Sequence, residues 1–267
     1  MSESPIALTR PPLPYALLEA GRALSELSML PAAEIPLSMA PSGDGHSVVV
    51  CPGFLTSDRS TGFLRRFIRS RGYNVYGWSL GRNLGPGLEG RNIDELADWV
   101  ITVYRQSRRK VSLVGWSLGG VMARELAKRM PDAIRQVVTL GSPISGQPES
   151  STISWLYERV AGPVKGATPE MQLLLERLHH PPVGVPSTAI FTKSDGIVPW
   201  RGCIEPEGPL TDNIEVMASH CGLGVNPFVF FAVADRLALP ERQWTPFDRT
   251  ASPWRRVAYP TAGHVYD

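Results

Sequence analysis

Ser117 lies in the segment VSLVGWSLGG, residues 111–120, where two glycines flank it at the spacing G-x-S-x-G. The spacing alone is weakly specific, but here it follows an apolar strand-like run and opens the helix-like run LGGVMARELAKRM. A serine at a tight turn from strand to helix presents its hydroxyl at the end of the strand, and small neighbours leave room where strand and helix almost touch. We therefore predict that Ser117 is a nucleophile; the alternative is an ordinary serine that caps a helix.

A serine hydroxyl is a poor nucleophile at neutral pH and needs a base within hydrogen-bond reach, most often a histidine. His220 follows the strand-like run NIEVMA in a loop of small residues, so it should reach the same edge of the sheet as Ser117. The remaining histidines precede the first strand, end a helix-like run or lie three residues from the chain end: His46, His179, His180 and His264. We predict His220 as the base, with a hydrogen-bonded core histidine as the alternative.

The acid that orients this histidine is expected after another strand, at the same edge of the sheet and before the histidine in the chain. Asp195 follows the run AIFT and meets these conditions. Asp212 begins the next strand and Asp235 lies within the last helix-like run, so a turn residue and a solvated helix face explain these two better. Asp195 is therefore the predicted acid.

Acyl transfer also needs hydrogen-bond donors for the oxyanion that forms in the transition state. The backbone N–H of Leu118, directly after the proposed nucleophile, is one candidate. A second should come from the loop after the first strand, where Pro52 has no N–H and Gly53 permits an unusual turn. This leaves Phe54 as the predicted donor and Leu55 as the alternative, unless the loop is a plain turn.

Strand-like and helix-like runs alternate along most of the chain and are separated by glycine and proline turns. This alternation predicts a mostly parallel sheet with helices on both faces. The strand-like runs are 46–54, 73–80, 110–116, 134–143, 187–200 and 213–224, and the helix-like runs between and after them are 61–72, 92–107, 118–130 and 226–239. The proposed catalytic residues lie directly after these runs or after the apolar part of a run.

The chain is predicted to have one main domain at 46–240, with an extension at 1–45 and an aromatic-rich tail at 241–267. A helical insertion at 146–186 separates the fourth and fifth strands and has the size of a lid. The extension contains one amphipathic helix, at residues 15–29, which should pack on the outside of the domain. Four leucines lie on its helical period: Leu17, Leu18, Leu24 and Leu27.

Composition excludes some classes of function. With 27 basic and 25 acidic residues the formal net charge is +2, so charge alone provides no attraction to nucleic acid or to an anionic membrane. We expect no membrane span and no secretory signal, because the chain has neither a long apolar run nor a basic, apolar start. A cytoplasmic protein is therefore expected; the oligomeric state is not indicated.

In this order, CPGF, GWSLGG, VVTLGSPISG, KSDGIVPW and SHCGLGVNP each occur at the end of a strand-like run. With the chain order serine, aspartate, histidine, they resemble the α/β-hydrolase fold family, in particular bacterial triacylglycerol lipases and carboxylesterases. The chain departs from that pattern twice. TLGSPISG lacks a histidine usual in the family, and Pro52-Gly53 stands where His-Gly is usual, which bears on substrate preference and not on the triad.

This resemblance implies an esterase or lipase that acts on a small-molecule ester, with lipid esters among the candidates, and needs no metal or organic cofactor. Trp155, Leu156, Tyr157 and residues 173–175 give the insertion an apolar character that suits acyl chains, although packing onto the domain explains it equally well. An acyltransferase or thioesterase would use the same triad. A non-catalytic scaffold of this fold is the alternative from another class of function.

Three cysteines, Cys51, Cys203 and Cys221, match no metal-binding spacing, and reduced thiols are the default expectation. Cys203 lies in the loop region after Asp195, and Cys221 adjoins His220. A disulfide between Cys203 and Cys221 is therefore a hypothesis that the two loops raise, against the reducing compartment expected for this chain.

Overall fold

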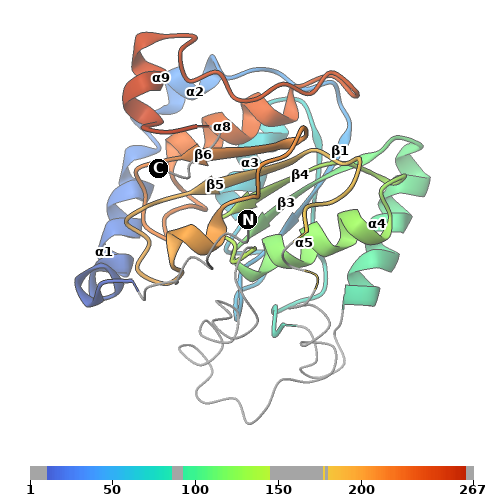
Figure 1. Ribbon diagram of the computed structural model, residues 1–267, viewed down its shortest axis with the longest axis horizontal. Helices are drawn as coiled ribbons and strands as arrows, with labels where there is room; N and C mark the ends of the chain where they lie inside the picture. Colours follow the sequence, from blue (N-terminus) through green and yellow to red (C-terminus); the bar gives the residue numbers. More distant parts are fainter. Residues whose placement is uncertain (1–10, 86–92, 145–176, 178–179, 263–267) are drawn as a thin grey trace, which may run out of the picture.

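The computed structural model of the chain describes residues 11–85, 93–144, 177 and 180–262. Within these residues six strands form one sheet in the order β2-β1-β3-β4-β5-β6, and all neighbouring strands are parallel (Figure 1). The strands are β1 (Ser47–Cys51), β2 (Asn74–Gly77), β3 (Val111–Trp116), β4 (Ile134–Leu140), β5 (Ser187–Phe191) and β6 (Thr211–Glu215). Each overlaps one of the strand-like runs, so the predicted parallel sheet is confirmed.

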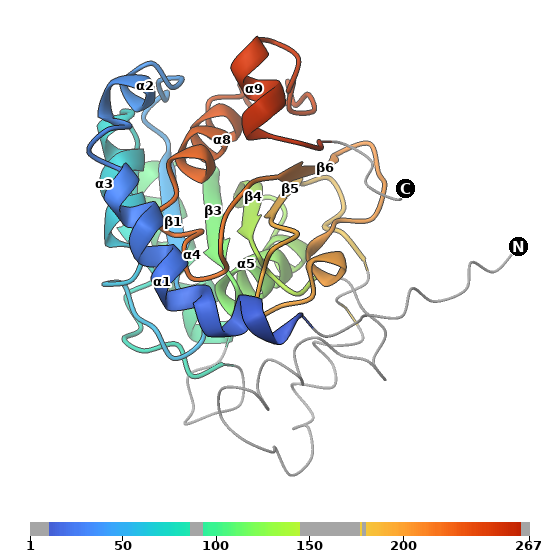
Figure 2. The same ribbon diagram turned by 90° about the vertical axis from the view of Figure 1, so that its left-hand side faces the viewer.

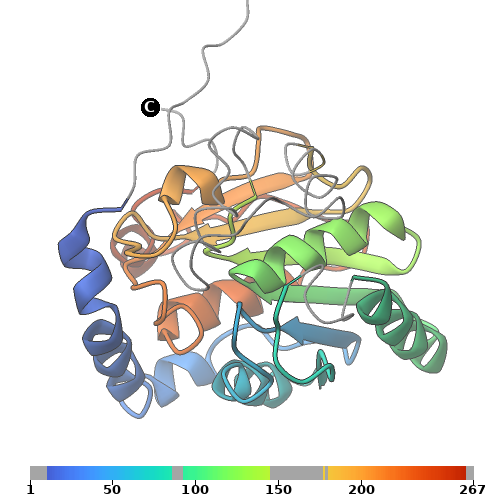
Figure 3. The ribbon, with the colours of Figure 1, turned by 90° about the horizontal axis from the view of Figure 1, so that it is seen from below.

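Helices cover both faces of this sheet (Figures 1 and 3). One face packs against α3 (Gly62–Ser70) and α8 (Pro227–Leu237), and the other against α4 (Ile93–Ser107) and α5 (Leu118–Arg129). The remaining described helices are α1 (Leu13–Met29), α2 (Glu34–Ser38), the 3-10 helix η2 (Trp200–Cys203) and α9 (Pro253–Ala258). We did not predict α2, η2 or α9, since so few residues show no helical period.

Alternation along the strands explains why the sheet is buried on both sides. In β1, Val48 and Val50 join the core under α3 and α8, whereas Val49 and Cys51 join the core under α4 and α5. Successive side chains of a strand point to opposite faces, so a strand covered on both faces reads as a continuous apolar run. The sequence SVVVC of β1 is such a run. Because the strands themselves are covered by helices, polar side chains that react with a substrate are expected in the loops after the strand ends.

Helix α1 forms where it was expected and lies along the outside of the domain (Figure 2), but its leucines do not form the packed face. Of the four leucines on the predicted period, Leu17, Leu18 and Leu24 are 75%, 57% and 67% exposed and Leu27 is half-buried, whereas Glu19 and Glu26 are buried. The helix is therefore oriented by its polar residues. None of the described helices has the length and apolar character needed to cross a bilayer.

The predicted insertion falls almost wholly outside the described residues, so its helices and its role as a lid stay predictions. The aromatic tail, by contrast, packs into the main core. Phe247 and Tyr259 are buried there, with ring centroids 4.7 Å apart, and Trp254 meets Phe231 of α8 edge to face. The domain boundaries drawn from the sequence also stay predictions.

A buried ion pair connects α5 with the segment that follows η2. Arg124 of α5 donates from Nε and from one terminal nitrogen to the two carboxylate oxygens of Glu205, each at 2.7 Å, and both side chains are fully buried. Ser187, the first residue of β5, donates its hydroxyl to the same carboxylate. These contacts fix the helix that follows Ser117 to the strand that leads to Asp195.

We predict that Arg124→Met lowers the free energy of unfolding by about 3–5 kcal/mol, because it leaves a buried carboxylate without its cationic partner. Urea unfolding measures this. The double variant Arg124→Met/Glu205→Leu should regain much of the loss, since apolar side chains then replace both charges. As a control, Arg109→Met removes an exposed pair with Asp44 and should cost about 0–1 kcal/mol. Equal losses in the single and double variants would contradict the account.

Candidate active site

Ser117 is the single residue between β3, which ends at Trp116, and α5, which begins at Leu118. Its backbone has φ 53° and ψ −125°, a conformation that residues with a side chain adopt rarely and at a cost. Hydrogen bonds hold it there: its N–H donates to the carbonyl of Leu140 at 2.8 Å, and its own carbonyl accepts from Gly120 at 2.9 Å. The tight strand-to-helix turn expected for this segment is thus present.

The glycines around Ser117 are explained by close backbone packing. A Cβ atom on Gly115 would lie 2.3 Å from Cα of Gly120, and a Cβ atom on Gly119 would lie 2.5 Å from the carbonyl oxygens of Cys51 and Pro52. Real side chains do not tolerate such distances from backbone. The glycines therefore let α5 approach both β3 and the loop that follows β1.

The loop after β1 lies against Ser117, because a Cβ atom on Gly53 would be 3.4 Å from that of the serine. Leu55, the alternative oxyanion donor, donates its N–H to the carbonyl of Asn83 at 2.7 Å. Leu118 begins α5, where first-turn N–H groups have no acceptor within the helix. The roles of Phe54 and Leu118 in an oxyanion hole stay predictions.

Asn83 is a residue of this region that was not predicted from the sequence. Its side chain is fully buried and donates to the carbonyl of Pro52 at 2.8 Å, while its backbone N–H donates to Thr56 at 2.7 Å. Together with the hydrogen bond from Leu55, these contacts hold the loop after β1 at Pro52 and at residues 55–56. A lone asparagine in a glycine-rich loop carries no periodic signal, so only the folded chain reveals this contact.

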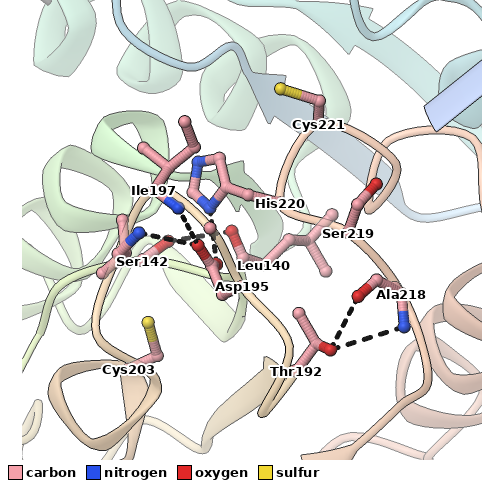
Figure 4. Close-up of polar contacts among 12 residues, drawn as sticks. Leu140, Ser142, Thr192, Asp195, Ile197, Cys203, Ala218, Ser219, His220 and Cys221 are labelled. Atoms are coloured by element: carbon pink, nitrogen blue, oxygen red, sulfur yellow. Dashed lines mark hydrogen bonds and ion pairs between the residues drawn. The ribbon is translucent and has the colours of Figure 1, made fainter. Parts of the chain in front are cut away.

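His220 and Asp195 lie in the loops after β6 and β5 and face each other (Figure 4). Nδ1 of the imidazole is 2.7 Å from Oδ2 of the carboxylate, and the two residues are only 5% and 3% exposed. The other carboxylate oxygen accepts from the N–H groups of Ile197 at 2.7 Å and Val198 at 2.6 Å. This leaves Nε2 of His220 as the nitrogen that does not face the acid.

The rival acids and histidines have other contacts. Asp212 accepts from the N–H of Phe247 at 2.6 Å, and Asp235 pairs with Arg236 and Arg255. His46, buried just before β1, contacts Ser112 near the beginning of β3, at the opposite end of that strand from Ser117. His180 is exposed, and the two remaining histidines lie outside the described residues.

Two contacts relate the histidine to the serine. Trp116, the residue before Ser117, donates its indole N–H to the carbonyl of His220 at 3.1 Å. Gly141 follows Leu140, which accepts the Ser117 N–H; a Cβ atom on Gly141 would lie 3.2 Å from Nδ1 of His220. The side chain of Trp116 and the backbone at Gly141 therefore both lie against the histidine, and Ser117, Asp195 and His220 all follow strands at the carboxyl edge of the sheet.

The charges around His220 favour its protonated form. Burial opposes the imidazolium, but the charge of Asp195, the hydrogen bond to it and the charge of Glu19 outweigh burial and raise the pKa of His220 above its ordinary value of 6.5. Glu19 comes from α1 and accepts the backbone N–H of His220 at 3.1 Å. The sequence gives no sign of this contact, because an acidic side chain in an amphipathic helix is ordinarily solvated.

Cys203 and Cys221 are both free thiols in the structure, so the disulfide considered from the sequence is not formed. Their sulfurs lie on opposite sides of the Asp195–His220 pair (Figure 4). Cys203 is buried in the apolar cluster around η2, whereas the backbone of Cys221 is held at α1 by Glu19. The two loops do meet, but through the acid and the histidine.

Comparison with known proteins supports a hydrolase. Residues 48–266 match the model of the alpha/beta hydrolase family. A pimeloyl-[acyl-carrier protein] methyl ester esterase of Shewanella woodyi is 40% identical over 48 residues, which is 18% of this chain and 19% of that enzyme. The chain thus matches about a fifth of the length of this curated relative.

Several solved structures share the fold. A monoacylglycerol lipase of Paleococcus ferrophilus has a TM-score of 0.54 at 18% identity, covering 74% of this chain and 96% of that one. Lipase B of Aspergillus fumigatus has a TM-score of 0.59 at 15% identity, covering 80% and 56%. A pyrethroid hydrolase of Sphingobium faniae has a TM-score of 0.53 at 18% identity, covering 73% and 98%. With the family match over most of its length, this chain belongs to the alpha/beta hydrolase family.

Proposed function

We propose that this protein hydrolyses carboxylic esters through Ser117, His220 and Asp195. The observation that carries the proposal is the buried His220–Asp195 hydrogen bond beside a serine held in a strained turn at the same edge of the sheet. The match to an esterase, although short, points in the same direction. The names of the structural neighbours agree, but at their low identity they support only the fold.

The proposed reaction begins when the hydroxyl oxygen of Ser117 attacks the ester carbonyl and Nε2 of His220 accepts its proton. Asp195 accepts a hydrogen bond from Nδ1 and stabilises the imidazolium that forms. The N–H groups of Leu118 and Phe54 stabilise the oxyanion of the tetrahedral intermediate. His220 then gives the proton to the departing alkoxide, which leaves as the alcohol, and a water molecule releases the acid from the acyl-enzyme by the same steps.

The first test is hydrolysis of p-nitrophenyl esters from acetyl to palmitoyl. We expect activity in the wild type and a fall of ~10³-fold or more in kcat for Ser117→Ala. Ser112→Ala is the matched control, because it removes a buried serine hydroxyl of β3 that contacts His46 and lies at the opposite end of the strand from Ser117. It should leave kcat/KM nearly unchanged.

A fluorophosphonate probe distinguishes the remaining outcomes. If Ser117 is labelled but the protein cleaves no ester, the proposal of ester hydrolysis gives way to one of acyl transfer to an acceptor other than water. If neither turnover nor labelling is found, the assignment of Ser117 as the nucleophile is wrong.

The pH dependence of kcat/KM tests the base. Imidazolium cannot accept the serine proton, so activity should fall as the pH decreases through the pKa of His220, at a midpoint above 6.5. Asp195→Asn should move this midpoint to lower pH, because it removes a charge that raises the pKa, and should reduce kcat by roughly 10⁴-fold. Asp235→Asn, the rival acid, should leave the midpoint in place. The reverse result would assign the acid to Asp235.

Gly119→Ala tests the approach of α5 to the oxyanion loop. Its Cβ would meet two backbone carbonyls at 2.5 Å, so we expect a loss of about 1–3 kcal/mol in the free energy of unfolding. Displacement of the loop should also lower kcat by ~10²-fold. Gly62→Ala, at the start of α3 with nothing within 4 Å, should alter neither stability nor kcat adversely. Wild-type kcat in Gly119→Ala would contradict the predicted oxyanion loop.

A further inference from the structure

Glu19 of α1 contacts both loops that carry the proposed acid and base. Its Oε1 accepts the backbone N–H of Gly196 at 2.8 Å and that of His220 at 3.1 Å, and its Oε2 accepts the N–H of Cys221 at 2.8 Å. Gly196 directly follows Asp195. One carboxylate, only 4% exposed, therefore connects the residue after the acid with the backbone of the base.

Two more residues of α1 extend this contact on the same face of the helix. Glu26 accepts both the N–H and the hydroxyl of Ser219 at 2.7 Å through Oε1. Arg22 donates to the carbonyl and the hydroxyl of Ser194, each at 2.7 Å, and to the carbonyl of Ala218 at 2.6 Å. The residues on either side of the acid and the base are thus held from α1.

Glycines in the two loops make room for α1. A Cβ atom on Gly196 would lie 2.5 Å from the backbone of Tyr15, and one on Gly222 would lie 2.2 Å from Oε2 of Glu26. Neither glycine has a positive φ, so close packing and not backbone conformation explains their type. The helix therefore contributes the polar side chains to this contact, and the loops contribute glycines that allow close approach.

The energetics identify these hydrogen bonds as the reason for the orientation of α1. A buried carboxylate is costly unless hydrogen bonds replace its water, and bonds from N–H groups to an ionised acceptor are among the stronger ones in proteins. The apolar side of the helix is left in solvent instead, with Leu13 and Leu17 64% and 75% exposed. Burial of the leucines would ordinarily be preferred, so the polar contacts outweigh it here.

We propose that Glu19, supported by Arg22 and Glu26, is a positioning residue that holds the loops of Asp195 and His220 in register for the proposed ester hydrolysis. It touches neither the substrate nor the reacting atoms; it acts through the backbone on either side of them. This inference rests on the proposed function for its kinetic consequences. Its structural basis is the set of contacts from α1.

Glu19→Gln tests the proposal, since glutamine keeps the size of the side chain but replaces an acceptor oxygen by a donor that faces N–H groups. We expect kcat to fall roughly 10- to 100-fold, with KM changed far less, because the base is displaced while the remainder of the site is kept. The pH midpoint of kcat/KM should also shift to lower pH, because the charge of Glu19 contributes to the raised pKa of His220. A merely structural loss would not move this midpoint.

Two controls separate this effect from general damage. Gly21→Ala lies on α1 with nothing within 4 Å, and Glu34→Gln removes an exposed acid from α2, so both should retain wild-type kcat and midpoint. Glu26→Gln should lower kcat with little change in the midpoint, because the charge of Glu26 is not among the causes that shift the pKa of His220. It also serves if Glu19→Gln does not fold.

Titration of the His220 ring by NMR keeps the two proposals apart. If the wild type cleaves no ester, the proposed function fails, but a lower pKa of His220 in Glu19→Gln would still support the positioning role. A folded Glu19→Gln protein with the kcat, midpoint and ring pKa of the wild type would overturn it. If Glu19→Gln does not fold, an unchanged kcat in Glu26→Gln would overturn the positioning role. A variant in which KM rises while kcat stays at the wild-type value would overturn it as well.

Discussion

The hydrogen bond between Nδ1 of His220 and Oδ2 of Asp195 joins two loops that follow neighbouring strands. Strand pairing fixes β5 and β6 only as far as Phe191 and Glu215, so the loops beyond need other restraints. Two backbone N–H groups orient the acid from within its own loop. The histidine loop is held from outside, by the indole of Trp116 and by Glu19. The 2.7 Å contact is thus the outcome of restraints from three parts of the chain.

These restraints also set the electrostatics of the site. Two carboxylates face the backbone or ring of His220, and both are buried, so water screens them little. Such charges are tolerated because backbone N–H groups donate to both carboxylates, and the guanidinium of Arg22 lies 4.0 Å from the carboxylate of Glu19. Their joint field favours the imidazolium, which is the state that the proposed mechanism needs while the oxyanion forms. The contacts that position the base therefore also raise its pKa.

The sheet could be predicted from the sequence, and so could the edge at which the candidate residues lie, because both follow from local patterns. Buried parallel strands read as apolar runs, and Ser117, Asp195 and His220 each follow one. The contacts of Glu19 could not be predicted, since its partners are backbone groups some two hundred residues away. The leucine period predicted the existence of α1 correctly, but the long-range hydrogen bonds decided which face is packed. The disulfide was suggested by two loops that do meet, although their sulfurs lie on opposite sides of the Asp195–His220 pair.

The proposed nucleophile and the proposed base are held by different kinds of force. Ser117 is fixed by a strained backbone, by glycine packing and by the sheet core on which α5 lies, all within the main domain. The conformational cost of its positive φ persists only because these surroundings over-determine it. His220 depends in addition on a helix that contacts its loop through polar groups and turns most of its leucines to solvent. Loss of the contacts from α1 should therefore displace His220 while the turn that holds Ser117 keeps its conformation.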